Sequence, residues 1–365
     1  MNSVVAERTF VRSDLVILGG GAVAVILAAV THFVGAGAVI PFVCSAAAVT
    51  LLASLVGRSV EQLGDRFGPG ATGVLQSALG NLPELFIALF ALKAGLVAVV
   101  QAALIGSILA NLLLVLGLAF LVGGLKHGTQ QLDSERARSI IVLMVLSVAA
   151  MVVPSLAFYV HTPAEKHEST LSIIVSVVLL VLFALTLPAS LRKQQRAGES
   201  GAEQEATESE APRWPLWLAV GLLALAAIAA AFVSDWFVVA LEPAMEALNI
   251  SEAFAGLVVV AIAGNAIENV VGVQLAAAGR SEYAFSVVIN SPMQIALVLA
   301  PLLVILSQVF GFATLTLVFP PMLVVAVVIA VILTAFITFD GESTWIEGAA
   351  LIAVYIVIAA SFWWG

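Results

Sequence analysis

Residues 80–84 read Gly-Asn-Leu-Pro-Glu, and residues 264–268, which lie 184 positions later, read Gly-Asn-Ala-Ile-Glu. The same offset carries Ser107 onto Ser291, and each serine lies in a further apolar stretch. Two motifs that share one offset predict an internal repeat. The repeat decides the fold, because the number of chain crossings between its copies fixes how the two halves are oriented.

The composition is that of a protein that lies mostly within a lipid bilayer. Of the 365 residues, 62% are hydrophobic and 10% are charged, and the mean hydropathy is +1.15. A soluble domain carries about 25% charged residues, because its surface must stay hydrated. The single cysteine, Cys44, excludes an internal disulfide framework and a cysteine metal cluster. We expect the bilayer as a partner, no nucleic acid and no resident cofactor.

Apolar stretches of about 20 residues, the length that crosses a bilayer as a helix, recur along the chain. They predict an all-α polytopic membrane protein with about eleven transmembrane helices. The second and seventh helices should continue beyond their apolar stretches, through Glu61 and Glu246. The predicted spans are residues 15–34, 38–57, 71–92, 96–122, 139–160, 170–191, 214–234, 252–278, 283–309, 313–338 and 344–364.

The positive charges orient these spans. With eleven spans, the N-terminus and every second loop face one side and carry all of the 14 lysines and arginines except Lys93 and Lys166. Lysine and arginine concentrate on the cytoplasmic side of membrane proteins. This bias predicts a cytoplasmic N-terminus, an external C-terminus and, as location, a prokaryotic-type plasma membrane.

The two copies of the repeat lie five spans apart, and an odd number means that they enter the membrane in opposite directions. We therefore predict an N-terminal segment with one extra helix (1–36), a first five-helix repeat (37–191), an acidic cytoplasmic loop (192–213) and a second five-helix repeat (214–365). The loop is interpreted as a solvated linker, with a weak cation sensor as the alternative. Inverted repeats are typical of secondary transporters, whose ion sites lie where the halves meet.

The repeated motif also predicts interrupted helices. Pro83 precedes Glu84 and Pro292 follows Ser291, and a proline removes one backbone hydrogen bond from a helix. Gly80 and Gly264 would let the backbone approach an ion closely. The carbonyl groups freed in this way could coordinate a cation beside the carboxylates.

Two acidic residues, Glu84 and Glu268, lie within predicted spans, where a charged side chain is energetically unfavourable and therefore suggests a function. A charged side chain at mid-bilayer costs at least ~2.5–3.5 kcal/mol. Two neighbouring carboxylates are stable either when protonated or when a cation bridges them, which is the physical basis of cation/proton exchange. Oxygen ligands favour Ca²⁺ or Na⁺ over a soft transition metal. The alternative is a pair of structural, hydrogen-bonded carboxylates, which the matched asparagines and glycines make less attractive.

At these residues the chain resembles the calcium/proton antiporters of the cation/calcium exchanger superfamily. The first half contains Gly-Asn-Leu-Pro-Glu-Leu at 80–85 and Gly-Ser-Ile-Leu-Ala-Asn-Leu-Leu-Leu-Val-Leu-Gly at 106–117. The second half contains Gly-Asn-Ala-Ile-Glu at 264–268 and Ser-Pro-Met-Gln-Ile-Ala-Leu at 291–297. These blocks are specific, whereas the rest of the likeness, over spans 2 to 11, is mostly hydropathy.

The resemblance implies roles for individual residues. Glu84 and Glu268 would bind the ion and the protons, at a site shared with Gly80, Gly264 and the asparagines. The polar residues implied to line the pathway are Asn81, Asn265, Ser107, Ser291 and Gln294. Spans 2 and 7 would slide to open each side in turn, and acidic residues on them would guide cations, unless these are simply interfacial charges that face water. They are Glu61, Asp235 and Glu242.

The leading interpretation is therefore a Ca²⁺/H⁺ antiporter that exports Ca²⁺ from the cytoplasm by alternating access, and not an enzyme. A Na⁺ or K⁺/H⁺ antiporter of the same fold is the alternative, because Asn269 stands where the family often has a histidine that could titrate near the site. A cation channel is a third, weaker alternative. Proton stoichiometry and assembly into a homo-oligomer stay open at this stage.

Overall fold

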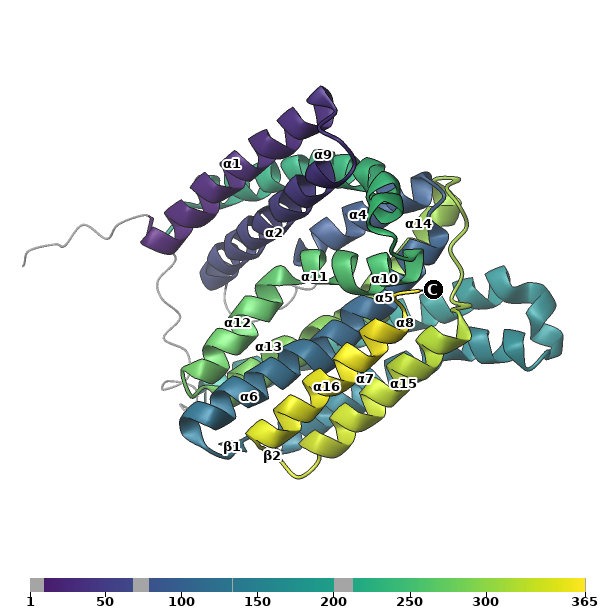
Figure 1. The fold of residues 1–365 in the computed structure, drawn as a ribbon. Coiled ribbons are helices and arrows are strands. Elements are labelled where there is room, and N and C mark those ends of the chain that lie inside the picture. The colour runs from purple at the N-terminus through teal and green to yellow at the C-terminus, as the bar shows by residue number, and fades with distance from the viewer. Residues whose placement is uncertain (1–9, 68–78, 133, 200–212, 365) are drawn as a thin grey trace, which may run out of the picture. The chain divides into compact units, whose positions relative to one another are not determined.

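The structure, a computed structural model, describes residues 10–67, 79–132, 134–199 and 213–364 (Figure 1). Within these residues the chain is almost entirely helical. In chain order the elements are α1 (Arg12–Val34), α2 (Val39–Phe67), α4 (Leu82–Lys93), α5 (Val97–Leu109), η1 (Ala110–Val115), α6 (Leu116–His127), β1 (Gln130–Gln131), α7 (Ser134–Tyr159), η2 (Pro163–His167), α8 (Glu168–Glu199), α9 (Leu216–Leu248), α10 (Glu252–Phe254), η3 (Ala255–Val260), α11 (Ala261–Gly264), α12 (Ala266–Ala277), α13 (Ser281–Gln294), η4 (Ile295–Leu299), α14 (Ala300–Val309), α15 (Pro321–Thr338), β2 (Glu342–Ser343) and α16 (Trp345–Ser361).

Most of these helices are long and apolar enough to cross a membrane. Among the described residues, eight helices meet that condition alone, and the bent run from α10 to α12 adds a ninth candidate. The prediction of an all-helical membrane protein is confirmed at this level. The predicted span 71–92 falls partly on residues 68–78, outside the described residues, and its later part is α4. Helices α2 and α9 continue through Glu61 and Glu246, as predicted.

The predicted cytoplasmic loop 192–213 begins as helix. Helix α8 continues to Glu199, beyond the predicted end of the sixth span at residue 191. Residues 200–212, with most of the acidic side chains of this loop, lie outside the described residues. The interpretation of the loop as a linker or a cation sensor therefore stays a prediction.

The predicted tenth span, residues 313–338, is wrong at its start. Helix α15 begins only at Pro321, and residues 312–320 form an irregular, extended segment. Every second side chain of this segment is fully buried, as in a strand with one face in a core. These side chains are Leu315, Leu317 and Phe319.

Side chains replace the missing helical hydrogen bonds of this segment. Gln101 Nε2 donates to the carbonyl oxygens of Thr316 (3.3 Å) and Val318 (2.8 Å). Non-helical backbone is tolerated in a membrane protein only where protein or water satisfies it. Three serine hydroxyls accept the backbone N–H groups: Ser307 from Leu315 (3.1 Å), Ser172 from Leu317 (3.0 Å) and Ser155 from Phe319 (2.9 Å).

The chain divides into two compact units, each built from two separate stretches of the sequence. The first unit comprises residues 1–87 and 184–244, and the second comprises 88–183 and 245–365. In the first unit, α1 lies along α2, and both contribute to a bundle with α9 (Figure 1). A buried apolar cluster joins α2 to the start of α9, and the rings of Phe42 and Phe237 stack with centroids 5.1 Å apart.

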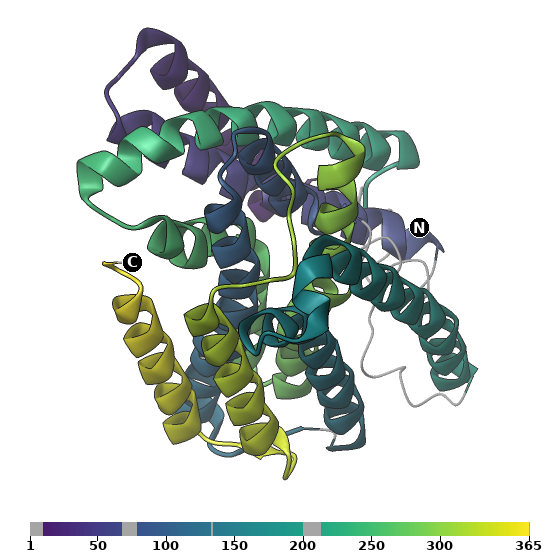
Figure 2. The ribbon, with the colours of Figure 1, turned by 90° about the vertical axis from the view of Figure 1, so that its right-hand side faces the viewer.

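In the second unit, the helices approach so closely that glycine is required at the contacts. Helix α6 lies along α16, and α7 lies along α15 (Figures 1 and 2). A Cβ atom on Gly117 would lie 2.8 Å from the carbonyl oxygen of Gly348. Likewise, a Cβ on Gly106 of α5 would collide with the backbone of Leu257 in η3, and one on Gly256 would collide with the backbone of α5. Small residues of this kind let membrane helices pack backbone to backbone.

The structure contains elements that recur at the offset of the sequence repeat. Helices α4 and α12 begin and end 184 residues apart. The π-helical segment η1 begins at Ala110, and η4 begins at Ile295, within one residue of the same offset. Pro292 lies inside α13 and does not end it, contrary to the predicted interruption. The π-helical segment η4 follows α13 directly, and its wider turn accommodates the local change in backbone hydrogen bonding.

Candidate functional site

The repeated Gly-Asn motif lies at a break between two helices in the second half. Helix α11 ends at Gly264, α12 begins at Ala266, and Asn265 between them has a non-helical backbone (φ −93°, ψ 22°). The helices on the two sides of the break are bent by 61°. The predicted interruption is present here although no proline adjoins it. The Asn265 side chain is fully buried.

Every hydrogen-bonding position of the Asn265 amide is occupied. Its Nδ2 donates to Ser107 Oγ (2.8 Å) and to the backbone carbonyl of Ala261 (2.9 Å). Its Oδ1 accepts from Asn111 Nδ2 (3.0 Å) and from Ser291 Oγ (3.1 Å). An amide can make four such bonds, so the break is held in one geometry by groups from α5, η1, α11 and α13. The predicted residues Ser107, Ser291 and Asn265 are therefore brought together.

Asn111 is the residue of this network that the sequence analysis did not single out. Its Nδ2 also donates to the carbonyl of Ser107 (2.9 Å) and to Ser291 Oγ (3.3 Å). Its Oδ1 is buried and accepts no hydrogen bond from any described residue. Leaving a buried acceptor unsatisfied costs about 1–3 kcal/mol, so this oxygen is available to a proton donor or a cation. We call Ser107, Asn111, Asn265 and Ser291 the amide–hydroxyl cluster.

Two of the three π-helical segments among the described residues, η1 and η4, adjoin this cluster. Asn111 is the second residue of η1, and Gln294, half-buried, immediately precedes η4. A π turn inserts one extra residue and re-aims the side chains next to it, which is why such segments gather at functional sites. Gln294, which the resemblance implies to line the pathway, is thus placed at an irregular turn.

The Gly-Asn motif of the first half, like that of the second, directly precedes a helix. Gly80 and Asn81 form a turn, and α4 begins at Leu82, so that Glu84 lies in the first helical turn. The side chains of Asn81 and Glu84 belong to buried residues, 9% and 8% exposed. A carboxylate is favoured at a helix N-terminus by the helix dipole.

Glu268 occupies the matching position in the second half, in the first turn of α12. Its side chain, like those of residues 266 and 267, lies outside the described residues. The expected pairing of Glu84 with Glu268 therefore stays a prediction. Within the described residues, no group of three or more histidine, cysteine, aspartate or glutamate side chains could hold a metal ion.

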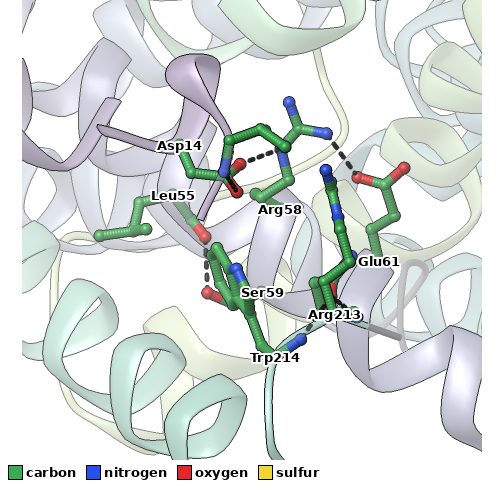
Figure 3. Close-up of polar contacts among 9 residues, drawn as sticks. Asp14, Leu55, Arg58, Ser59, Glu61, Arg213 and Trp214 are labelled. Carbon is green, nitrogen blue, oxygen red and sulfur yellow. Dashed lines mark hydrogen bonds and ion pairs between the residues drawn. The ribbon is translucent and has the colours of Figure 1, made fainter. Parts of the chain in front are cut away.

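The three acidic residues predicted to guide cations differ in their surroundings. Glu242 is exposed and Asp235 is half-buried, both on α9. Glu61 on α2 is exposed but carries a partner, because Arg58 Nη1 donates to its Oε2 at 3.2 Å (Figure 3). Arg58 was counted in the sequence only as a cytoplasmic positive charge, so its contact with Glu61 was not anticipated.

The chain matches known proteins over nearly its whole length. The family described as sodium/calcium exchanger protein matches residues 37–191 and 218–364. A Ca²⁺/H⁺ antiporter of Synechocystis is 36% identical over 347 residues, which cover 91% of this chain and 92% of the relative. The Ca²⁺/H⁺ antiporter ChaA of Bacillus subtilis is 37% identical over 315 residues, which cover 86% and 89%. The solved structure of native YfkE superposes with a TM-score of 0.80 at 33% identity, over 95% of this chain and 99% of that one.

Proposed function

The chain belongs to the sodium/calcium exchanger protein family, and on that basis we propose that it is a secondary active antiporter that exchanges Ca²⁺ for protons. The amide–hydroxyl cluster carries the proposal. It consists of amide and hydroxyl groups at a helix break one turn before Glu268, and Asn111 Oδ1 among them accepts no hydrogen bond from any described residue. Calcium prefers such a set, in which amide, hydroxyl and carbonyl oxygens supplement carboxylates.

Exchange follows from the two stable states of the carboxylates. When Glu84 and Glu268 are protonated, no ion is needed to offset their charge in the membrane. When a Ca²⁺ ion bridges them, it displaces those protons, because both cannot neutralise the same carboxylates at once. A membrane proton gradient then drives Ca²⁺ export, provided that the site opens to one side at a time. Two protons per Ca²⁺ would make the cycle electroneutral.

The proposed topology has eleven spans, with inverted repeats at 37–191 and 214–365 after one extra helix. The matching bounds of α4 and α12, and of η1 and η4, support a repeat at an offset of 184 residues. The lysine and arginine bias supports a cytoplasmic N-terminus and an external C-terminus. Gly80 and Gly264 would allow backbone carbonyls to approach the ion at the two breaks.

In the proposed pathway, Asn81, Ser107, Ser291 and Gln294 line the route to the carboxylates. Glu61, Asp235 and Glu242 attract cations at its two ends. Helices α2 and α9, which would carry these three acids, slide to expose the site alternately. A homo-oligomer is compatible with this cycle.

A Na⁺ or K⁺/H⁺ antiporter is the second candidate. Asn269 favours it, because a neutral amide at this position supplies no titratable group beside the site. A monovalent ion would need fewer displaced protons, and the same oxygen ligands would accept it. The two candidates differ only in the ion that couples to proton movement.

The test uses inverted membrane vesicles, whose cytoplasmic face is outward, energised to an acid interior. Ca²⁺, Na⁺ or K⁺ is added in turn, and the interior pH is followed. Glu84→Gln and Glu268→Gln are compared with the parent. Glu165→Gln is the matched control, because Glu165 lies in η2, outside the proposed site, where its Oε2 is 3.0 Å from His161 Nδ1.

If the proposal is right, Ca²⁺ dissipates the gradient with the parent and the Glu165 variant, and neither site variant responds. A response to Na⁺ or K⁺ alone would replace calcium by the second candidate. If no cation moves protons, or if the site variants behave like the parent, the exchange mechanism is wrong.

A further inference from the structure

Three charged side chains meet where α1 lies against α2. Arg58 of α2 lies between Asp14 of α1 and Glu61, which is one turn further along α2 (Figure 3). Its Nη1 is 3.2 Å from Glu61 Oε2, and its Nε is 3.5 Å from Asp14 Oδ1. One arginine is thus shared by two carboxylates that come from different helices.

The two carboxylates differ sharply in their access to water. The Asp14 side chain is 0% exposed, that of Arg58 is 26% exposed and that of Glu61 is 56% exposed. Asp14 Oδ2 accepts the backbone N–H of Val11 at 3.1 Å. Asp14 Oδ1 accepts no hydrogen bond from any described residue, although Arg58 Nε lies nearby. The buried partner therefore has unused capacity to bind the guanidinium more closely.

We propose that Arg58 is a positioning residue that passes from Glu61 to Asp14 when a divalent cation from the cytoplasm is captured at Glu61. This inference rests on the proposed function and on the proposed topology, in which the end of α2 that carries Arg58 and Glu61 faces the cytoplasm. A cation can bind the exposed Glu61 carboxylate only if Arg58 releases it. Asp14 makes that release inexpensive, because the arginine keeps a carboxylate partner throughout.

The surrounding contacts allow the side chain to move while the helix stays in place. Gln62 Oε1 accepts the backbone N–H groups of Arg213 (2.9 Å) and Trp214 (3.1 Å). Arg66 Nη2 donates to the carbonyl of Trp214 at 2.6 Å. These bonds fix α2 to the segment before α9 without using Arg58. The exchange of partners is therefore a local movement of one guanidinium group.

The experiment measures the initial rate of Ca²⁺-driven proton loss in inverted vesicles against Ca²⁺ concentration, normalised to folded protein. Asp14→Asn keeps an acceptor for the Val11 N–H but leaves Arg58 with Glu61 alone. The apparent KM should rise about two- to fivefold, the range of one exposed ion pair, with kcat within about twofold. In Asp14→Asn/Arg58→Gln, Glu61 is free, and KM should fall to or below the parent value.

Two further variants separate this role from a merely structural one. Glu61→Gln should raise KM, and adding Asp14→Asn to it should change nothing more, because the competition no longer exists. Arg66→Gln is the matched control, since it removes another arginine of α2 that bonds a carbonyl; its KM should stay within about twofold of the parent. If Asp14→Asn folds poorly, the test relies on Asp14→Asn/Arg58→Gln, in which both charges are removed together.

The outcomes distinguish this inference from the proposed function. If the parent exchanges Ca²⁺ for protons but the Asp14 and Arg58 variants have the same KM as the parent, the inference is wrong and the proposed function stands. Loss of kcat to the same extent in both Asp14 variants would also overturn it, because that result indicates simple disruption of α1. A parent that moves no protons with any cation overturns both.

Discussion

The two compact units of this protein are packed by different means, although both are built from apolar helices. In the second unit, glycines such as Gly106 and Gly117 lie so close to a neighbouring backbone that no Cβ atom fits. In the first unit, a Cβ on Gly20 of α1 would lie 3.7 Å from a leucine side chain, an ordinary contact, and one on Gly19 would meet nothing within 4 Å. The described helices of the first unit instead meet through side chains: a buried apolar cluster, stacked rings and the ion pairs of Arg58.

This difference indicates which helices are able to shift. Backbone-to-backbone packing has one low-energy arrangement, whereas side chains between helices can change rotamer as the helices slide. The second unit therefore suits a rigid support for the amide–hydroxyl cluster. The first unit, which contains α2 and most of α9, suits the moving part that the proposed cycle requires.

The largest effect should come from filling a glycine contact. Gly106→Ala would drive a methyl group into the backbone of Leu257, and we expect the free energy of unfolding to fall by about 3 kcal/mol or more. Gly20→Ala should instead stabilise α1 by about 0.5–1 kcal/mol, because alanine is the better helix former. Thermal unfolding of both variants in one detergent measures the contrast. Equal melting temperatures would refute the distinction between the two units.

The next effect concerns the amide–hydroxyl cluster. Asn265→Ala removes four hydrogen bonds and leaves buried partners unsatisfied, so unfolding should become easier by about 2–3 kcal/mol. Transport should fall at least about tenfold, which corresponds to 1.4 kcal/mol at the barrier. Vesicle transport at matched folded protein is the measurement. Asn249→Gly is the control at an exposed asparagine after α9, because glycine also adopts the positive φ of 54° found there. A fully active Asn265→Ala protein would contradict the assignment.

Gln101 should have a smaller effect on the same unit. Gln101→Ala leaves the carbonyls of Thr316 and Val318 without their side-chain donor, and we expect a loss of about 1–2 kcal/mol in stability. Hydrogen exchange of residues 312–320 should increase while that of α6 stays the same. Unchanged exchange in that segment would show that other contacts hold it.

The smallest effect should come from the ring contacts of the first unit. The rings of His32 and Trp236 stack with centroids 5.5 Å apart and join α1 to α9. His32→Ala should cost about 0.5–1 kcal/mol of stability, because the ring contacts that it removes, with Trp236 and with the adjacent Phe33, are partly exposed. Thermal unfolding checks this, and a loss as large as that of Gly106→Ala would show that the first unit is packed as rigidly as the second.

Much of this architecture follows from local sequence. Span length, the extension of α2 and α9, and the helix break at Asn265 were predictable from hydropathy and from the repeated Gly-Asn motif. The extended segment 312–320 was not, because its apolar residues resemble the start of a helix. The groups that satisfy its backbone come from helices distant in sequence, among them Gln101 and Ser172.

The candidate site was predictable only where both copies of the repeat carry it. Ser107 and Ser291 share the offset of 184 residues, and both lie in the cluster. Asn111 was missed because the same offset leads to Ile295, which is apolar. Arg58 was missed because its partner Asp14 belongs to the extra helix, which has no copy in the repeat.

The central claim is that one site binds either Ca²⁺ or protons, and proton release on Ca²⁺ binding tests it most directly. Ca²⁺ is added to the purified protein in a weakly buffered solution, and the released protons are counted against bound Ca²⁺. We predict release of one or two protons per ion from the parent, and none from a Glu84→Gln/Glu268→Gln variant. Tight Ca²⁺ binding without proton release from the parent would contradict the claim.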